Sequence, residues 1–373
     1  MTIQEYLTAQ KDVPFSSLPF HDVDNTILAE LAYIDYEGIF REGEEALPLS
    51  EVERRFFATH DAEEIDKTAK FCDRAPLLLQ EMAKGCRFRD ILLSHYVTEV
   101  DTEETKQFSA LVFHLSEKAW YIAYRGTDAT LNGWKESLLM SYLEETGGSK
   151  AAVDYLNRIG SEHSGELLVG GHSKGGYFAM YASIFCQPEI QERITVVFNN
   201  DGPGMHEGII FSPEYQCIRP RMRNIVPDSS LIGQLLFNEG EHKVVKSNAE
   251  GIFQHDAFSW VVEGTEFSQT KLSPFSLFMQ ASLGCWLEEL DAESRASIID
   301  TIFSLLETTG SESFPEMREQ RLKNTETVLR GLVQLPEEKR HELLNAFHSL
   351  LGSGRRTVLK SLLPKCEEDK REL

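Results

Sequence analysis

The chain lacks a long apolar run and closely spaced cysteines. No segment of its 373 residues approaches the ~18 uninterrupted apolar residues of a membrane-spanning helix, and its first five residues show no basic or apolar leader. We therefore expect no stable membrane insertion and a cytoplasmic location. The cysteines are scattered, and several lie in apolar segments, which favours reduced core thiols over disulfides. They are Cys72, Cys86, Cys186, Cys217, Cys285 and Cys366.

Basic residues are also scarce. The chain has 37 Lys and Arg against 60 Asp and Glu, which gives a formal net charge of −23. Such a charge repels phosphates, so we expect no nucleic-acid partner, and it favours solubility. No His and Cys spacing typical of zinc and no Gly-x-Gly-x-x-Gly pattern occurs, so we assign no cofactor. The sequence leaves the oligomeric state open.

The most informative stretch is residues 167–177. An apolar run there ends in Gly171-His172-Ser173-Lys174-Gly175, and a helical pattern follows at once. Gly-x-Ser-x-Gly between a strand and a helix is typical of a nucleophile elbow. The tight turn strains the serine backbone, and side chains on either glycine would clash where the strand and the helix nearly touch. This context predicts that Ser173 is a nucleophile.

A second segment agrees with this interpretation. Residues 119–124 read as a buried strand that runs into Arg125-Gly126-Thr127-Asp128. An acyl-transfer site needs two N–H donors for the developing oxyanion, one after the nucleophile and one after an earlier strand. Lys174 and Thr127 occupy these two places, and the Thr127 hydroxyl would be a further donor.

Together, Tyr124-Arg125-Gly126-Thr127 and residues 171–176 resemble the paired signatures of the class 3 (fungal-type) lipases, which belong to the α/β-hydrolase superfamily. A closer likeness is to an uncharacterised bacterial family of lipase-like hydrolases, whose pattern is also matched by residues 22–25 and 254–260. The resemblance covers about residues 15 to 310. It implies a serine ester hydrolase with a Ser…Asp…His order along the chain.

Three acids compete for the triad after Ser173. Asp201 follows a strand at residues 194–198, Asp228 follows one at 223–226, and Asp256 adjoins a histidine, which makes it a poor partner for that residue. In class 3 lipases the acid follows the second strand past the elbow, so the resemblance implies Asp228. Asp201 is then structural or part of the pocket wall.

Four histidines compete for the base. His242 opens the strand-like run at 243–246, and His255 follows that run by a loop, which is where the resemblance places the catalytic histidine. His341 and His348 lie on a charged amphipathic helix and are expected to be solvated. The predicted triad is therefore Ser173, Asp228 and His255.

The pattern of apolar residues predicts an α/β-hydrolase fold with a mixed, mostly parallel sheet flanked by helices. Residues 1–84 form an N-terminal helical segment, in which Asp24 caps a helix. Residues 85–262 form the hydrolase core, and residues 263–373 form a C-terminal helical extension. Expected core elements are strands at 94–100, 108–115, 119–124, 166–170, 194–198, 223–226 and 243–246, with helices at 131–143 and 150–159.

The chain departs from secreted lipases in two ways. Lys174 stands where lipases commonly have an apolar residue, and no hydrophobic lid is evident between Thr127 and Ser173. We therefore expect a soluble acyl ester or thioester substrate, a lysophospholipid included, rather than activation at a lipid surface. Phe258, Trp260 and residues 275–279 are expected to wall the pocket. The alternative interpretation is a catalytically silent hydrolase fold that serves as a binding or scaffold module.

Overall fold

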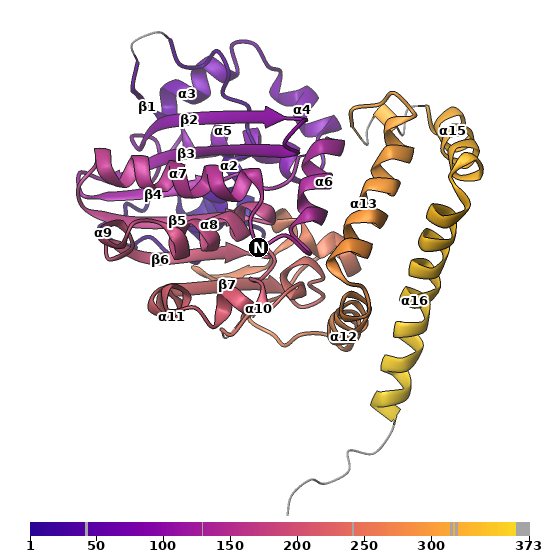
Figure 1. The fold of residues 1–373 in the computed structure, drawn as a ribbon. Coiled ribbons are helices and arrows are strands. Elements are labelled where there is room, and N and C mark those ends of the chain that lie inside the picture. The colour runs from indigo at the N-terminus through magenta and orange to yellow at the C-terminus, as the bar shows by residue number, and fades with distance from the viewer. Residues whose placement is uncertain (42–43, 129, 241, 314–315, 318–319, 363–373) are drawn as a thin grey trace, which may run out of the picture.

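The computed structural model describes residues 1–362 except 42–43, 129, 241, 314–315 and 318–319. A central sheet of eight strands, ordered β1 to β8 as in the sequence, lies between layers of helices (Figure 1). The strands are β1 (Ala46–Pro48), β2 (Leu92–Asp101), β3 (Lys106–Ser116), β4 (Ala119–Tyr124), β5 (Glu166–His172), β6 (Ile194–Asn200), β7 (Met222–Pro227) and β8 (His242–Val245).

The sheet has two halves with different connections. Strands β1 to β4 pair antiparallel, and the turns between β2, β3 and β4 are short. Strands β4 to β8 pair in parallel, which requires crossovers that return the chain to the starting edge. This mixed, mostly parallel sheet confirms the predicted α/β-hydrolase fold. Helices of the parallel half are α6 (Leu131–Leu139), α7 (Gly147–Glu162), α8 (Lys174–Phe185), α9 (Pro188–Gln191), α10 (Glu207–Ile210) and α11 (Pro213–Ile218).

Each face of the sheet carries its own apolar core. Along β3, Phe113 belongs to the core shared with α1, α2 and α5, whereas its neighbour Val112 belongs to the core shared with α7 and α8. Their cross-strand partners Tyr121 and Ile122 on β4 divide in the same way. Because successive side chains of a strand point to opposite faces, these continuous apolar strands are buried on both sides.

The first 84 residues are mostly helical, with one strand that the sequence did not predict. β1 pairs with β2 at the edge of the sheet. The helix predicted to begin at Asp24 begins at Asp22 and is capped by His21, so the capping prediction was wrong. Asp24 is instead fully buried in an ion pair with Arg87. The helices are α1 (Ile3–Gln10), α2 (Asp22–Leu31), α3 (Leu49–Phe56), α4 (Ala62–Thr68) and α5 (Ala75–Met82).

Helices dominate after residue 262, although a two-stranded ribbon of β9 (Val262–Glu263) and β10 (Glu266–Phe267) comes first. Ile299 and Phe303 of α13 pack on Leu131 of α6, so this part contacts the core through α6 (Figure 1). No helix within the described residues is long and apolar enough to cross a membrane. The three-segment division stays a prediction, and residues 363–373 lie outside the described part. The helices are α12 (Pro274–Glu289), α13 (Ala292–Glu307), α15 (Arg321–Gln334) and α16 (Glu337–Leu362).

Four of the six cysteines are free thiols; Cys186 is buried, but Cys86 and Cys217 are exposed and are not the core thiols that the sequence predicts. The side chain of Cys285 and all of Cys366 lie outside the described part of the chain. The free thiols are Cys72, Cys86, Cys186 and Cys217.

Candidate active site

Ser173 lies at the turn between β5 and α8, in the strand–turn–helix context that the motif predicts. Its backbone has φ 58° and ψ −130°. This conformation is strained for an L-amino acid and persists only where the surrounding structure enforces it. The first amides of α8 have no partner within the helix. The turn therefore presents a partly exposed serine at the N-terminus of α8, and the Gly176 amide donates to the Ser173 carbonyl.

The glycines on either side of Ser173 permit this turn. A Cβ atom on Gly171 would collide with the backbone of Gly175, and one on Gly175 would collide with the carbonyl of Tyr124. Gly176 is crowded by the side-chain amide of Asn199 in the same way. The strand, the helix and the end of β4 thus approach more closely than any side chain would allow.

His255 lies beside this turn and is paired with Asp201. Its Nδ1 is 2.7 Å from Asp201 Oδ2, and its ring centroid is 4.6 Å from that of His172, the residue before Ser173. The His255 side chain is 30% exposed, whereas that of Asp201 is fully buried. The prediction that Asp228 pairs with His255 was therefore wrong.

The loop after β7 explains why Asp201 holds this position. Ser230 Oγ and the Gly233 amide both donate to Asp201 Oδ1, which leaves Oδ2 for the imidazole. Asp201 has a φ of 49°, a left-handed conformation that aspartate tolerates better than most residues. Asp228 instead accepts from the neighbouring Ser229 hydroxyl. The segment that was expected to carry the triad acid instead supplies donors that orient Asp201.

A buried polar network beneath the site joins the ends of β5 and β6. Asn200 donates to the carbonyl of Gly171 and accepts from Asn25 Nδ2 at 2.8 Å. Tyr121 donates to Asn25 Oδ1 at 2.7 Å. Sequence reasoning missed these roles, although Asn25 lies in one of the motifs that carry the lipase likeness and Asn200 directly precedes Asp201.

The register of the strands brings the loop after β4 next to the Ser173 turn. Tyr124 and Gly171 are partners across β4 and β5, so the residues that follow each strand lie side by side. Ser137 Oγ donates to the Gly133 carbonyl, so the Thr127 hydroxyl donates to Ser137 at 2.6 Å. The Thr127 hydroxyl is therefore already engaged, so it is not the additional donor that the sequence predicts.

The side chain of Lys174 forms a buried ion pair that sequence reasoning missed. Its Nζ is 2.8 Å from Glu136 Oε2, and it also donates to Gln107 Oε1 at 2.6 Å. The Lys174 and Glu136 side chains are 1% and 0% exposed. Burial lowers the pKa of Lys174, and Glu136 opposes that shift. The pair fixes α6, which follows the Thr127 loop, against the helix that begins at Lys174.

Glu136 makes a full set of hydrogen bonds. Besides Lys174, its carboxylate accepts from the Gln107 amide, the Thr146 hydroxyl and the Gly148 amide. A buried charge is tolerated when every lone pair has a donor. Lys174 stands where lipases commonly have an apolar residue. Its buried charge is therefore paired with the carboxylate of Glu136, which lies 38 residues away along the chain.

His172 supports the backbone of His255. Its Nε2 lies 2.8 Å from the His255 carbonyl, which can only accept, so this nitrogen carries a proton. Its Nδ1 is 3.2 Å from both the Tyr33 hydroxyl and Glu30 Oε1. Burial lowers the pKa of His172 and raises that of Glu30, so both side chains are favoured in their neutral forms.

The remaining candidate residues lie elsewhere. His242 Nδ1 is 3.1 Å from Gln234 Nε2, and Asp256 accepts from the Phe258 amide as a helix cap. His341 and His348 are exposed on α16, as expected. None of these four side chains has a hydrogen bond or ion pair with the His255 side chain among those that the structure describes, although the charges of Asp256 and His255 interact.

The residues that were expected to wall the pocket lie in two different places. Phe258 and Trp260 are buried in the core shared with α1, and the Trp260 ring is 6.3 Å from that of His172. At the start of α12, Ser276 donates to the Ser230 carbonyl, so this helix begins beside the loop that orients Asp201. Phe275 and Leu277 are 46% and 50% exposed.

More than half of the chain matches a known protein family. The model of the Mbeg1-like family matches residues 82–304, which is more than half of the chain. The chain belongs to the Mbeg1-like family. The match includes the Thr127 loop, the Ser173 turn, Asp201 and His255. No curated protein matches the chain.

Solved lipase structures are more distant. A fungal lipase–inhibitor complex has 15% identity and a TM-score of 0.33 over 42% of this chain and 63% of that one. The Rhizomucor miehei lipase–propeptide complex has 15% identity and a TM-score of 0.32 over 43% and 58%. M37 lipase has 16% identity and a TM-score of 0.33 over 66% and 83%. The chain thus spans less than two thirds of the two fungal lipase chains.

Proposed function

We propose that this protein is a serine hydrolase of acyl esters in which Ser173, His255 and Asp201 form the triad. The observation that carries the proposal is the 2.7 Å contact between Asp201 and His255, directly beside the strained turn of Ser173. A buried carboxylate on Nδ1 fixes the tautomer whose Nε2 accepts a proton. Asp201 replaces Asp228 in this assignment.

In the proposed reaction, His255 Nε2 takes the Ser173 proton as Oγ attacks the acyl carbon. The backbone amides of Thr127 and Lys174 stabilise the oxyanion, and His255 returns the proton to the leaving alcohol. Water then hydrolyses the acyl-enzyme with the same residues. The Lys174–Glu136 ion pair supports this role because it joins the helix after one proposed donor to the helix after the other.

The proposed substrate is an ester or thioester with an apolar acyl chain, a lysophospholipid included. Large apolar side chains are exposed on segments that follow carboxyl ends of strands, among them Trp134 on α6 and Phe253 just before His255. Because Glu136 and Lys174 bind α6 to α8, α6 is part of a fixed wall and not a hinged lid. The cytoplasmic location stays a prediction from the sequence.

Hydrolysis of p-nitrophenyl esters of increasing chain length tests the proposal. Ser173→Ala should reduce kcat/KM by on the order of 10³-fold or more, because the nucleophile is lost. Ser161→Ala, an exposed serine at the end of α7, is the matched control and should behave as wild type. A folded wild-type protein that hydrolyses no ester in the series would favour a catalytically silent binding module.

A further inference from the structure

A second cluster of histidines and a carboxylate lies at the opposite end of β5 from Ser173. Glu162 ends α7 and His163 follows it, just before β5 begins, whereas His95 comes from β2. One ring nitrogen from each histidine and one carboxylate oxygen of Glu162 all lie within 4.8 Å of one another. β5 has seven residues, so this cluster is roughly 20 Å from the nucleophile turn.

The spacing of the cluster suits a small tetrahedral ion. Zinc binds His nitrogen and carboxylate oxygen at about 2.0–2.2 Å, which places neighbouring ligand atoms about 3.3 Å apart. His95 Nε2 and Glu162 Oε2 are already 3.2 Å apart. His163 is the third residue of the cluster, and its ring centroid is 5.0 Å from that of His95.

Surrounding side chains hold His95 in place. It has a φ of 55° within the irregular register of β2, and Tyr155 donates to its carbonyl at 2.8 Å. Bulges of this kind re-aim a side chain. His95 Nδ1 is 2.7 Å from Ser94 Oγ, which is in turn bonded to His114 Nε2. A hydrogen bond on the second ring nitrogen is typical of metal-ligating histidines.

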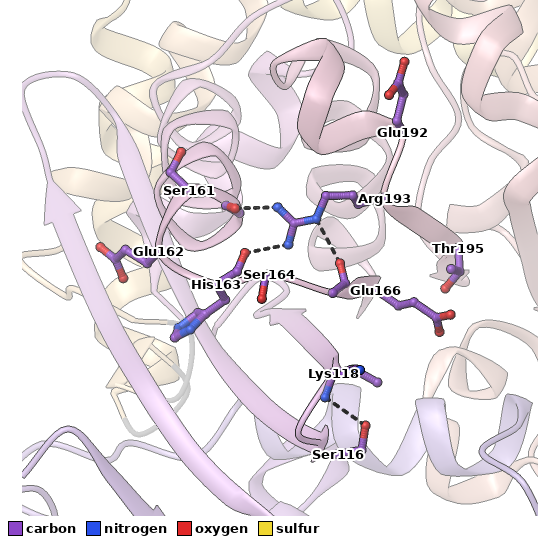
Figure 2. Close-up of a pocket in the computed structure, with 13 residues that line it drawn as sticks. Ser116, Lys118, Ser161, Glu162, His163, Ser164, Glu166, Glu192, Arg193 and Thr195 are labelled. Carbon is purple, nitrogen blue, oxygen red and sulfur yellow. Dashed lines mark hydrogen bonds between the residues drawn. The ribbon is translucent and has the colours of Figure 1, made fainter.

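The turn that carries the other two residues is also fixed. The Arg193 guanidinium donates to the carbonyls of Gly160, His163 and Gly165, and Figure 2 shows the His163 ring on the side away from Arg193. The His163 ring stacks on Trp120 at 3.9 Å, and its buried Nε2 has no hydrogen-bond partner among the described residues.

Charge and access also fit a cation. The ion pair between Glu162 and Arg158 is long, at 3.8 Å, and the Glu162 side chain is 44% exposed. The carboxylate therefore keeps oxygen lone pairs that can bind a cation. Glu162 and His163 also lie at the border of an open cleft of about 920 Å³, which His95 does not line.

We propose that His95, Glu162 and His163 bind one Zn²⁺ ion, with water as a fourth ligand. The ion would join the bulge of β2 to the end of α7 at the amino edge of the parallel strands. Sequence spacing did not reveal this site, because His95 lies 67 residues before Glu162 and only the fold brings them together.

Zinc titration of the metal-free full-length protein tests the proposal. Isothermal titration calorimetry of protein stripped with a chelator should give one Zn²⁺ per chain. His95→Gln and His163→Gln should each abolish that binding, and Ser94→Ala should weaken it by roughly 10-fold or more through its contact with His95. The matched control is His341→Gln, because His341 forms a surface pair with Glu337 at 3.7 Å and should leave binding unchanged.

A measurement on wild type alone covers the case in which a variant does not fold. X-ray absorption of the zinc-loaded protein should show two imidazole nitrogens and only nitrogen or oxygen ligands. The proposal is overturned by absence of Zn²⁺ binding to wild type, by equal binding to a folded His95→Gln or His163→Gln variant, or by sulfur ligation.

Discussion

A carboxylate lies against a histidine both at the carboxyl ends and at the amino ends of the parallel strands, here called the carboxyl edge and the amino edge. The two carboxylates differ in burial and in how many hydrogen bonds they accept. At the carboxyl edge, Asp201 is fully buried, and donors from the following loop occupy its second oxygen. At the amino edge, Glu162 is 44% exposed and faces two histidines and an arginine. The first carboxylate can only orient one imidazole, whereas the second is free to serve as a ligand.

Asp201 and Glu162 carry the same chemical group. Their proposed roles differ because one carboxylate is buried with its oxygens already hydrogen-bonded and the other is partly exposed. A carboxylate whose remaining lone pairs are already used holds its partner in one geometry and one tautomer. A carboxylate that keeps free lone pairs next to neutral imidazoles offers a set of donors to a cation. Substitutions at each edge should therefore have effects that differ in kind.

The largest expected effect is at the carboxyl edge. Asp201→Asn should lower kcat by roughly 10⁴-fold, because an amide stabilises the wrong tautomer of His255. Asp228→Asn is the control, since Asp228 accepts only from its neighbour Ser229 among the described side-chain contacts, and it should stay within a few-fold of wild type. Steady-state ester hydrolysis measures both. Equal losses in the two variants would remove the distinction between the acids.

The ion pair that joins the two proposed oxyanion donors should mainly affect stability. Lys174→Met leaves Glu136 buried without a counter-charge, which should cost about 3–5 kcal/mol of unfolding free energy. The double variant Lys174→Met/Glu136→Gln removes both charges and keeps an amide oxygen that can accept from Thr146 and Gly148, so it should recover part of that loss. Denaturant unfolding measures the cycle, and a double variant as unstable as the single one would show that the charges do not act as a pair.

The smallest expected effect is a pH dependence at the amino edge. Burial lowers the pKa of His114 to about 4 and also lowers that of His95 and His163. Because the unfolded value is about 6.5, the unfolded chain takes up protons first as pH falls, and stability is lost below about pH 6.5. His114→Gln should flatten the fall in Tm between pH 6.5 and 4, measured in chelator. An unchanged slope would contradict this origin.

Much of the fold could be predicted from the sequence because its signals are local. Apolar runs mark β3, β4 and β5, and Gly171 and Gly175 mark a turn that only one geometry permits. β1 was missed because three residues carry no periodicity, and they form a strand only through pairing with β2.

The site was harder to predict because its decisive contacts are not local. Asp201 and Asp228 both follow parallel strands, and a turn of positive φ decides which one reaches His255. The Asp201-Gly202 pair was a usable signal, since both residues favour tight turns. Glu136 gave no signal, because its partner Lys174 meets it only in the folded protein.

Labelling with a fluorophosphonate, followed by peptide mapping, tests the central claim most directly. Wild type should carry one phosphonyl adduct on Ser173. Asp201→Asn should label far more slowly, Asp228→Asn should label at the wild-type rate, and Ser173→Ala should not label at all. An adduct on another serine, or folded wild-type protein that stays unlabelled, would contradict the proposed Ser173, His255 and Asp201 triad.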